Sequence, residues 1–191
     1  MANDAFFSHL HADSDIRDVI LKYGKRFEPL SLFTDTLLRG QSDFSVLERE
    51  TLAAYVSALN SCTYCYNMHH EVAKRFGIDG ALIEALLEDI DSAPTSDKLK
   101  PVFHYVKKLT QSPSKMVKAD AERVFAAGWS EMALTDAICI CALFNLYNRL
   151  LDGHGIKGNA PIYDSGADHL TKRGYKMGFI PQFLYRMGWM K

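Results

Sequence analysis

The sequence predicts an all-α protein. Apolar residues recur at spacings of three and four along most of the 191 residues, as on one face of an amphipathic helix. No run of alternating polar and β-branched residues indicates a strand. Capping patterns and glycine stops divide the apolar segments, such as the capping box of Ser45 and Glu48 and the stop at Gly77. We therefore expect a bundle of consecutive helices.

The first four predicted helices cover, in order, about 13–27, 29–40, 46–60 and 61–76. Asp13 or Ser14 can cap the first helix. Pro29 fits the first turn of the second helix, and Gly40 ends it. The capping box and the glycine stop named above bound the third and fourth helices, which follow each other almost directly.

The next four predicted helices cover about 79–87, 96–110, 119–127 and 130–151. Asp79 and Ser96 can serve as N-caps, and Gly128 stops the third of these helices. Ser130 opens the last one, which is the most apolar segment of the chain.

The pattern divides the chain into a helical domain over 1–152 and an irregular C-terminal arm over 153–191. We expect one short helix in the arm, near 165–172. The arm is rich in aromatic residues and, beyond His169, carries basic but no acidic side chains. Apolar residues at this density need a cover, so we expect the arm to pack on the domain or on a neighbouring subunit.

Composition excludes several classes of protein. Hydrophobic residues make up 48% and charged residues 24%, as in soluble globular proteins. The net charge of −1 excludes a whole-chain polyelectrolyte grip on nucleic acid. We expect neither a membrane span nor a signal peptide, because the apolar runs are short and no basic segment precedes them. Four cysteines are too few for a disulfide scaffold, so we expect a cytoplasmic, reducing location.

Cys62, Cys65 and His69 form the motif most suited to chemistry. At about 100° per residue on a helix, the cysteines differ by about 60° and His69 lies within about 40° of each, so the three share one face. Cβ atoms at i and i+3 are about 5–6 Å apart, which allows a disulfide after modest adjustment. Cys62 sits in the first turn, where the helix dipole favours a thiolate. Glu50, on the preceding helix, can orient His69 if the two helices pack as an antiparallel hairpin.

These residues are compatible with more than one kind of site. Peroxide reduction needs an attacking thiolate, a proton donor and a second thiol, which the motif supplies. It also requires a path from solvent to the sulfurs. A zinc site would use Cys62, Cys65, His69 and either Glu50 or His70, although one helix face supplies three ligands at most. The remaining alternatives are a helical oligomer whose cysteine pair senses oxidation without turnover, a non-redox enzyme that uses Glu50 and His69 as acid and base, and a buried structural cysteine pair.

The same residues carry a family resemblance. The order C-x-x-C-x-x-x-H, with eleven residues between Glu50 and Cys62, resembles the motif of the alkylhydroperoxidase AhpD-like family within the carboxymuconolactone decarboxylase superfamily. The surrounding ERETLAAYVSALNSCTYCYNMHH matches that motif closely, and the later NLYNRLLDGHGI is similar to the peroxidase-related branch. The resemblance covers about residues 25–155.

The resemblance implies an AhpD-like helical bundle with the cysteines on a helix of a central hairpin. It also implies a homo-oligomer, as a dimer, trimer or hexamer, and thiol-dependent reduction of hydrogen peroxide or organic hydroperoxides. Carried over, Cys65 is the attacking cysteine, Cys62 the resolving cysteine, and His69 with Glu50 the proton relay. The dipole argument above favours Cys62 as the attacking thiolate instead. No metal, haem or flavin is implied, and an external dithiol supplies the electrons.

Three further residues are expected around the site. Tyr64 stands two positions after Cys62, where characterised hydroperoxidases often have histidine, so it is a weaker proton donor at that place. Arg149 and Asp152, together with Asn148, can form a polar cluster at the end of the long apolar helix. The decarboxylase members generally lack the cysteine pair, which argues against lactone chemistry here. We expect no nucleic-acid or membrane partner.

Overall fold

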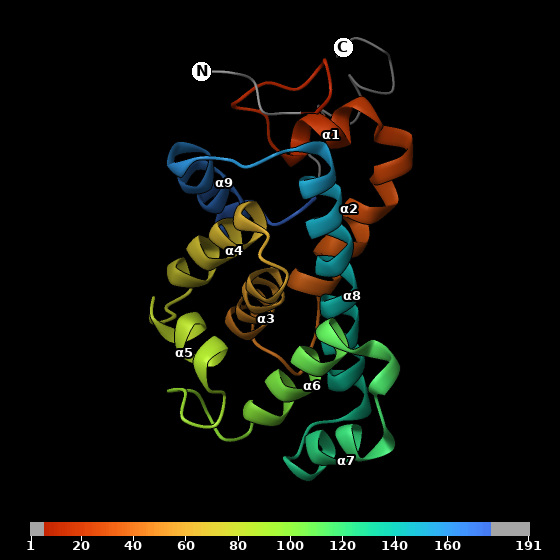
Figure 1. Cartoon of the computed structure of the whole chain (residues 1–191), viewed down its shortest axis with the longest axis vertical. Coiled ribbons are helices and arrows are strands. Elements are labelled where there is room, and N and C mark those ends of the chain that lie inside the picture. Colours follow the sequence, from red (N-terminus) through yellow and green to blue (C-terminus); the bar gives the residue numbers. More distant parts are fainter. Residues whose placement is uncertain (1–5, 177–191) are drawn as a thin grey trace.

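The structure is a computed structural model that describes residues 6–176 (Figure 1). Regular structure within this range is entirely helical, which confirms the predicted all-α class. The elements are α1 (Ile16–Lys22), α2 (Gly24–Arg39), α3 (Val46–Leu59), α4 (Thr63–Arg75), α5 (Leu82–Glu88), α6 (Lys100–Gln111), a 3₁₀ turn (Pro113–Lys115), α7 (Lys118–Ala126), α8 (Glu131–His154) and α9 (Ala160–Arg173).

Helix α3 lies at the centre of the molecule and packs against α2, α4, α5, α6 and α8 (Figure 1). Its start is fixed by the predicted capping box. The Ser45 hydroxyl accepts a hydrogen bond from the Glu48 amide at 3.2 Å, and the Glu48 carboxylate accepts one from the Ser45 amide at 2.7 Å. Every residue from 49 to 56 is buried, so polar side chains in this stretch must find partners inside the protein.

The predicted hairpin of α3 and α4 is present, and this pair of helices makes the most extensive contact in the structure. The chain reverses within a short turn in which Ser61 adopts a left-handed conformation, with φ of 56°. Cys62 follows as the N-cap of α4, which sets the first turn of that helix beside the end of α3.

The N-terminal helices differ from the prediction. The break falls at Tyr23 rather than near Phe27, and Pro29 lies inside α2. Asp15, not Asp13 or Ser14, is the N-cap of α1, with a capping box to Asp18. At this boundary Tyr23 leaves the helical conformation, with φ of −118° and ψ of 29°, and α2, which follows it, packs against α8.

Helix α8 runs along the long axis of the molecule in Figure 1 and contacts α2, α3, α4, α6 and α7. Among the described residues it is the one helix long and apolar enough to cross a membrane by length and composition. The core helices of soluble proteins pass the same test, and the side chains of α8 that face its neighbours are buried.

Helix α9 is longer than the short helix expected near 165–172. Asn159 caps it by accepting a hydrogen bond from the Ile162 amide at 3.0 Å, and Pro161 suits its first turn. Gly166 lies within this helix, and its absent side chain makes room for Met68 of α4, since a Cβ there would lie 2.5 Å from the Met68 side chain. The predicted arm therefore contains a regular helix packed on α4, and its last part, residues 177–191, lies outside the described residues.

Candidate active site

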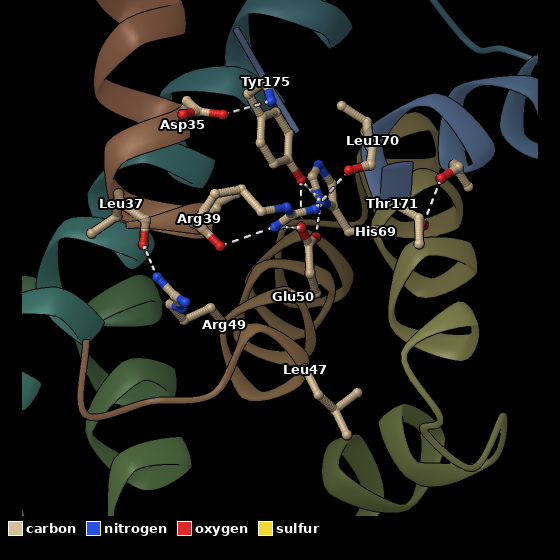
Figure 2. A network of polar contacts seen from close by, with 12 residues as sticks. Asp35, Leu37, Arg39, Leu47, Arg49, Glu50, His69, Leu170, Thr171 and Tyr175 are labelled. Atoms are coloured by element: carbon tan, nitrogen blue, oxygen red, sulfur yellow. Dashed lines mark hydrogen bonds and ion pairs between the residues drawn. The ribbon is translucent and has the colours of Figure 1, made fainter. Parts of the chain in front are cut away.

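A buried carboxylate joins α3 to α4. Glu50 is fully buried, and its Oε2 lies 2.8 Å from Nδ1 of His69 (Figure 2). The Arg39 guanidinium, at the end of α2, donates to Oε1 at 2.6 Å. The Tyr175 hydroxyl, beyond α9, donates to the same oxygen at 2.7 Å. The structure thus brings together the two predicted relay residues and adds two partners from distant parts of the chain.

The partners of Glu50 keep its charge in place. Burial by itself raises the pKa of Glu50, but the hydrogen bond with His69 and the charges of His69 and Arg39 outweigh it and leave the pKa below its ordinary value. Burial and the adjacent carboxylate raise the pKa of Tyr175 well above its ordinary value, so this phenol stays protonated and donates. With Glu50 ionised, Nδ1 of His69 carries the proton in their hydrogen bond, and Nε2 is the nitrogen left to act as a base.

The two cysteines of the motif are neighbours at the start of α4. Cys62 is the N-cap residue, and its thiol points to the backbone oxygen of Asn148 at 3.9 Å. The Cys65 thiol interacts directly with Cys62, and both are free thiols. Burial first, and then the neighbouring Cys62, raise the pKa of Cys65 well above its ordinary value. Cys65 is therefore a protonated thiol until a base or a hydrogen-bond donor acts on it.

Both thiols are covered. Cys62 has 0% and Cys65 has 2% of its surface exposed, so the path to solvent that peroxide chemistry requires is closed in this conformation. Tyr163 of α9 packs edge-on against Tyr64, the neighbour of Cys65 in the chain, with 5.8 Å between the ring centroids. Gly158 allows this close packing, because a Cβ there would lie 2.7 Å from the Tyr163 ring and 2.8 Å from the Tyr64 ring.

His69 lies one helical turn beyond Cys65 on the same face of α4. Its hydrogen bonds go to Glu50 and, at 3.3 Å, to Tyr175, and its ring packs edge-on against Phe144 of α8. No hydrogen bond between His69 and either thiol occurs among the described residues. The arrangement is therefore two adjacent units along one helix, a thiol pair and a histidine–carboxylate pair.

The structure places the other predicted site residues differently. Tyr64 is buried and accepts a hydrogen bond from the Ile16 amide at the start of α1, on the side of α4 away from Glu50. Arg149 is exposed and donates to Asn145 at 2.8 Å. Asp152 is exposed as well, and its charge contributes to the raised pKa of Cys65. Arg149 is therefore linked to Asn148 through the side-chain amides of Asn145 and Asn60. Asp152 acts on Cys65 only through its charge.

Two solved structures resemble the chain over most of its length. One is titled an uncharacterized peroxidase-related protein from Silicibacter sp. TM1040, with 21% identity over 85% of this chain and 95% of that chain, and a TM-score of 0.68. The other is titled an alkylhydroperoxidase AhpD core, an uncharacterized peroxidase-related protein from Ralstonia eutropha JMP134, with 18% identity over 87% of this chain and 98% of that chain, and a TM-score of 0.70. The chain has the AhpD-like fold. No protein-family model matches the sequence, and no curated protein does.

The AhpD-like fold does not assemble the zinc site considered from the sequence. No group of three or more His, Cys, Asp or Glu side chains within residues 6–176 is placed to hold a metal ion. The oxygens of Glu50 are taken by Arg39, Tyr175 and His69. His70 points away from the cysteines toward the Gly80 carbonyl, 3.0 Å from Nε2.

Sequence reasoning missed Arg39 and Tyr175. Neither stands in a motif: Arg39 precedes the glycine that ends a helix, and Tyr175 lies in the aromatic arm. The Asp35 carboxylate holds the segment after α9 in place by accepting a hydrogen bond from the Tyr175 amide at 2.9 Å. The sequence carries one indirect signal, because a buried Glu50 needs a cationic partner. That need does not identify which arginine supplies the charge.

Proposed function

We propose that this protein is a thiol-dependent peroxidase that reduces hydrogen peroxide or an organic hydroperoxide through a Cys62–Cys65 disulfide. The observation that carries the proposal is the 2.8 Å contact of His69 with the buried Glu50, on the helix that also holds the adjacent cysteines. A structural cysteine pair has no need of a base held in a fixed tautomer one turn away.

The proposed reaction has two steps. The Cys65 thiolate attacks the terminal peroxide oxygen and the O–O bond breaks. The departing alkoxide, or hydroxide when the substrate is hydrogen peroxide, takes a proton from His69, which gives an alcohol or water and a Cys65 sulfenic acid. Cys62 then attacks the sulfenic sulfur, which forms the disulfide and releases water. An external dithiol returns both cysteines to thiols by exchange. Before each attack, His69 takes the proton of the attacking thiol, and Glu50 stabilises the imidazolium that forms. His69 then gives this proton to the leaving oxygen and is neutral again.

The proposal requires access to the sulfurs, which the closed conformation does not provide. We assign the cover to α9, which packs on α4 and whose Tyr163 ring packs edge-on against Tyr64. Local opening of a peripheral helix costs less than global unfolding, so α9 can admit a small peroxide without loss of the core. The proposal therefore includes movement of α9 away from α4 before reaction.

We extend the proposal to the setting of the protein. Electrons come from a dithiol carrier, which suits a reducing cytoplasmic location. A homo-oligomer is supported by large apolar side chains left exposed on α2 and α8, namely Leu32, Phe33, Met132 and Leu146.

The test is peroxide consumption by the purified protein with a dithiol as the electron donor. We expect Cys65→Ser to abolish turnover and Cys62→Ser to stop it after one oxidation per chain. Cys139→Ser is the matched control, because Cys139 lies on α8 outside the site, and turnover should persist. Turnover that survives Cys65→Ser contradicts the proposal.

A second candidate is a non-redox enzyme in which Glu50 and His69 act as base and acid. The fully assembled Glu50–His69 pair beside covered thiols favours it. This alternative predicts an activity on a lactone or keto acid that survives replacement of both cysteines by serine and is lost in His69→Gln.

A further inference from the structure

Tyr175 connects the histidine–carboxylate pair to the end of α9. It stands two residues beyond Arg173, the last residue of that helix. Its hydroxyl donates to Glu50 Oε1 at 2.7 Å and lies 3.3 Å from Nδ1 of His69 (Figure 2). Its ring lies nearly parallel to the His69 ring, at 11°, with 6.1 Å between the centroids. The helix to which we assign the cover of the thiols therefore leads directly to the buried carboxylate.

Arg39 of α2 makes a second link between α9 and Glu50. Its Nη1 donates to Glu50 Oε1 at 2.6 Å, and its Nη2 donates to the backbone oxygen of Leu170, in the last turn of α9, at 3.1 Å. The guanidinium carbon also lies 4.9 Å from the centroid of the Tyr175 ring, within the range of a cation–π contact. The C-terminal end of α9 is thus attached to Glu50 through two side chains, which meet on one carboxylate oxygen.

The backbone beyond α9 is shaped to bring Tyr175 to this position. Gly174 has φ of 71°, which side chains other than glycine rarely allow, and a Cβ there would lie 2.6 Å from the Asp35 carboxylate. The same carboxylate accepts a hydrogen bond from the Tyr175 amide at 2.9 Å. The insertion of Tyr175 therefore follows from a specific turn held by α2.

We propose that Tyr175 is a positioning residue that ties α9 to the charge of Glu50, so that the cover of the thiols and the histidine–carboxylate pair open together. This inference deepens the peroxidase function proposed above, and it rests on that function for the need of α9 to move. A hydrogen bond to a charged group is stronger than one between neutral groups, so the tie is strongest while the buried Glu50 is ionised.

The tie can act on the whole of α9, because this helix depends on its contacts. A helix of 14 residues is only marginally stable by itself in water, so packing on α4 keeps α9 formed. Such segments open largely as cooperative units. Loss of a contact at the C-terminal end therefore also makes opening easier at the other end, near Tyr163.

Opening of α9 would change the proton relay at the same time. Tyr175 would leave Glu50 Oε1, whereas the 2.8 Å contact of Oε2 with Nδ1 of His69 lies between α3 and α4 and does not involve α9. With one donor fewer, more of the carboxylate charge is available to stabilise the His69 imidazolium. The relay is thus strengthened when the thiols become accessible.

The test measures amide hydrogen exchange of α9, and alkylation of Cys62 and Cys65 by iodoacetamide, in the native protein by mass spectrometry. Tyr175→Phe keeps the ring and removes only the hydroxyl. We expect both the exchange and the alkylation to become about tenfold faster, because each depends on local opening of α9. Ser130→Ala is the control for general destabilisation. It removes the N-cap of α8, whose hydroxyl accepts from the Ala133 amide at 3.0 Å, and should leave both rates near those of the wild type.

A double-mutant cycle with Glu50→Gln separates the tie from packing of the ring. Glu50→Gln removes the charge, so Tyr175→Phe should speed exchange of α9 several-fold less in this background than in the wild type. Equal effects in the two backgrounds would overturn the inference. Unchanged exchange of α9, or unchanged alkylation of the thiols, in folded Tyr175→Phe would overturn it as well. If Glu50→Gln does not fold, as judged by circular dichroism, the rates of Tyr175→Phe decide.

Neither readout requires peroxide, so the tie and the proposed function can fail separately. Faster opening of α9 in Tyr175→Phe, together with a wild-type protein that never reduces peroxide, would establish the tie and leave the proposed function wrong. Peroxide turnover in a protein whose α9 opens no faster in Tyr175→Phe would refute the tie alone.

Discussion

Glu50 is an ionised carboxylate with no exposure to solvent, and three donors compensate for the lost hydration. Arg39, Tyr175 and His69 each reach it within 2.8 Å. Truncating one partner of such a group is more costly than the net value of the contact, because the other partners stay buried without a complement. Single substitutions among these four residues are therefore expected to lower the stability of the protein strongly.

Acidification tests the state of Glu50. Its pKa is lower in the folded protein than in the unfolded chain, where it is about 4.3. The stability that Glu50 contributes is complete above the unfolded pKa and is lost as pH falls from there through the folded pKa. We expect the free energy of unfolding to fall in this window and Glu50→Gln to flatten the slope, measured by urea denaturation at several pH values. Glu88→Gln, on the surface of α5, is the control; equal slopes in all three proteins would contradict an ionised Glu50.

Tyr175→Phe removes a single hydroxyl from the same network. The lost hydrogen bond is to a buried charge, so we expect the free energy of unfolding to fall by about 1.5–3 kcal/mol. Tyr105→Phe, on α6 and outside the network, should have a smaller effect in the same denaturation experiment. A loss no larger than that of the control would show that Tyr175 does not bind Glu50 in solution.

At the scale of elements, local signals in the sequence predicted most helices. The capping box before α3, Ser130 before α8 and the glycines after α4 and α7 act within a few residues, so they can be recognised without the fold. The start of α9 has a local signal of the same kind, Asn159 as the N-cap with Pro161 in the first turn, which the prediction of an irregular arm missed. No such signal marks the break at Tyr23, where no side-chain hydrogen bond caps α2.

Gly158 is the point at which packing of α9 can be tested. Its φ is +68°, and a Cβ would collide with the rings of Tyr163 and Tyr64. We expect Gly158→Ala to lower the free energy of unfolding by about 1–3 kcal/mol and to speed alkylation of Cys62 and Cys65 under native conditions. Gly153→Ala is the matched control, because nothing lies within 4 Å of its added Cβ. Identical alkylation rates in the two variants would show that α9 does not cover the thiols.

At the scale of the molecule, the site divides into a part that the sequence predicts and a part that only the fold supplies. Glu50, Cys62, Cys65 and His69 lie in one hairpin, so helical geometry and spacing bring them together. Arg39, Asn148 and Tyr175 arrive from α2, α8 and the segment after α9. These residues reach the hairpin through tertiary contacts, which no local pattern encodes. Asn148, for example, lies more than seventy residues along the chain from the hairpin residues that it contacts.

The predicted homo-oligomer also belongs to this scale. Leu32 on α2 is 60% exposed and Met132 on α8 is 67% exposed, and contact with a second copy of the chain would bury such side chains. We expect sedimentation velocity to give a mass that is a multiple of the 21.5 kDa chain, and Leu32→Glu to shift the distribution toward the monomer. Glu28→Gln on the same helix is a charge-changing control. A wild-type protein that sediments as a monomer would contradict this expectation.

The central claim is that Cys62 and Cys65 form a redox pair served by His69 and Glu50. Intact-protein mass spectrometry after one equivalent of peroxide, followed by alkylation and peptide mapping, tests it most directly. The account predicts a loss of two hydrogen atoms per chain, located as a Cys62–Cys65 disulfide, and much slower formation in His69→Gln. Cysteines that remain fully alkylatable after peroxide, or oxidation confined to Cys139, would contradict it.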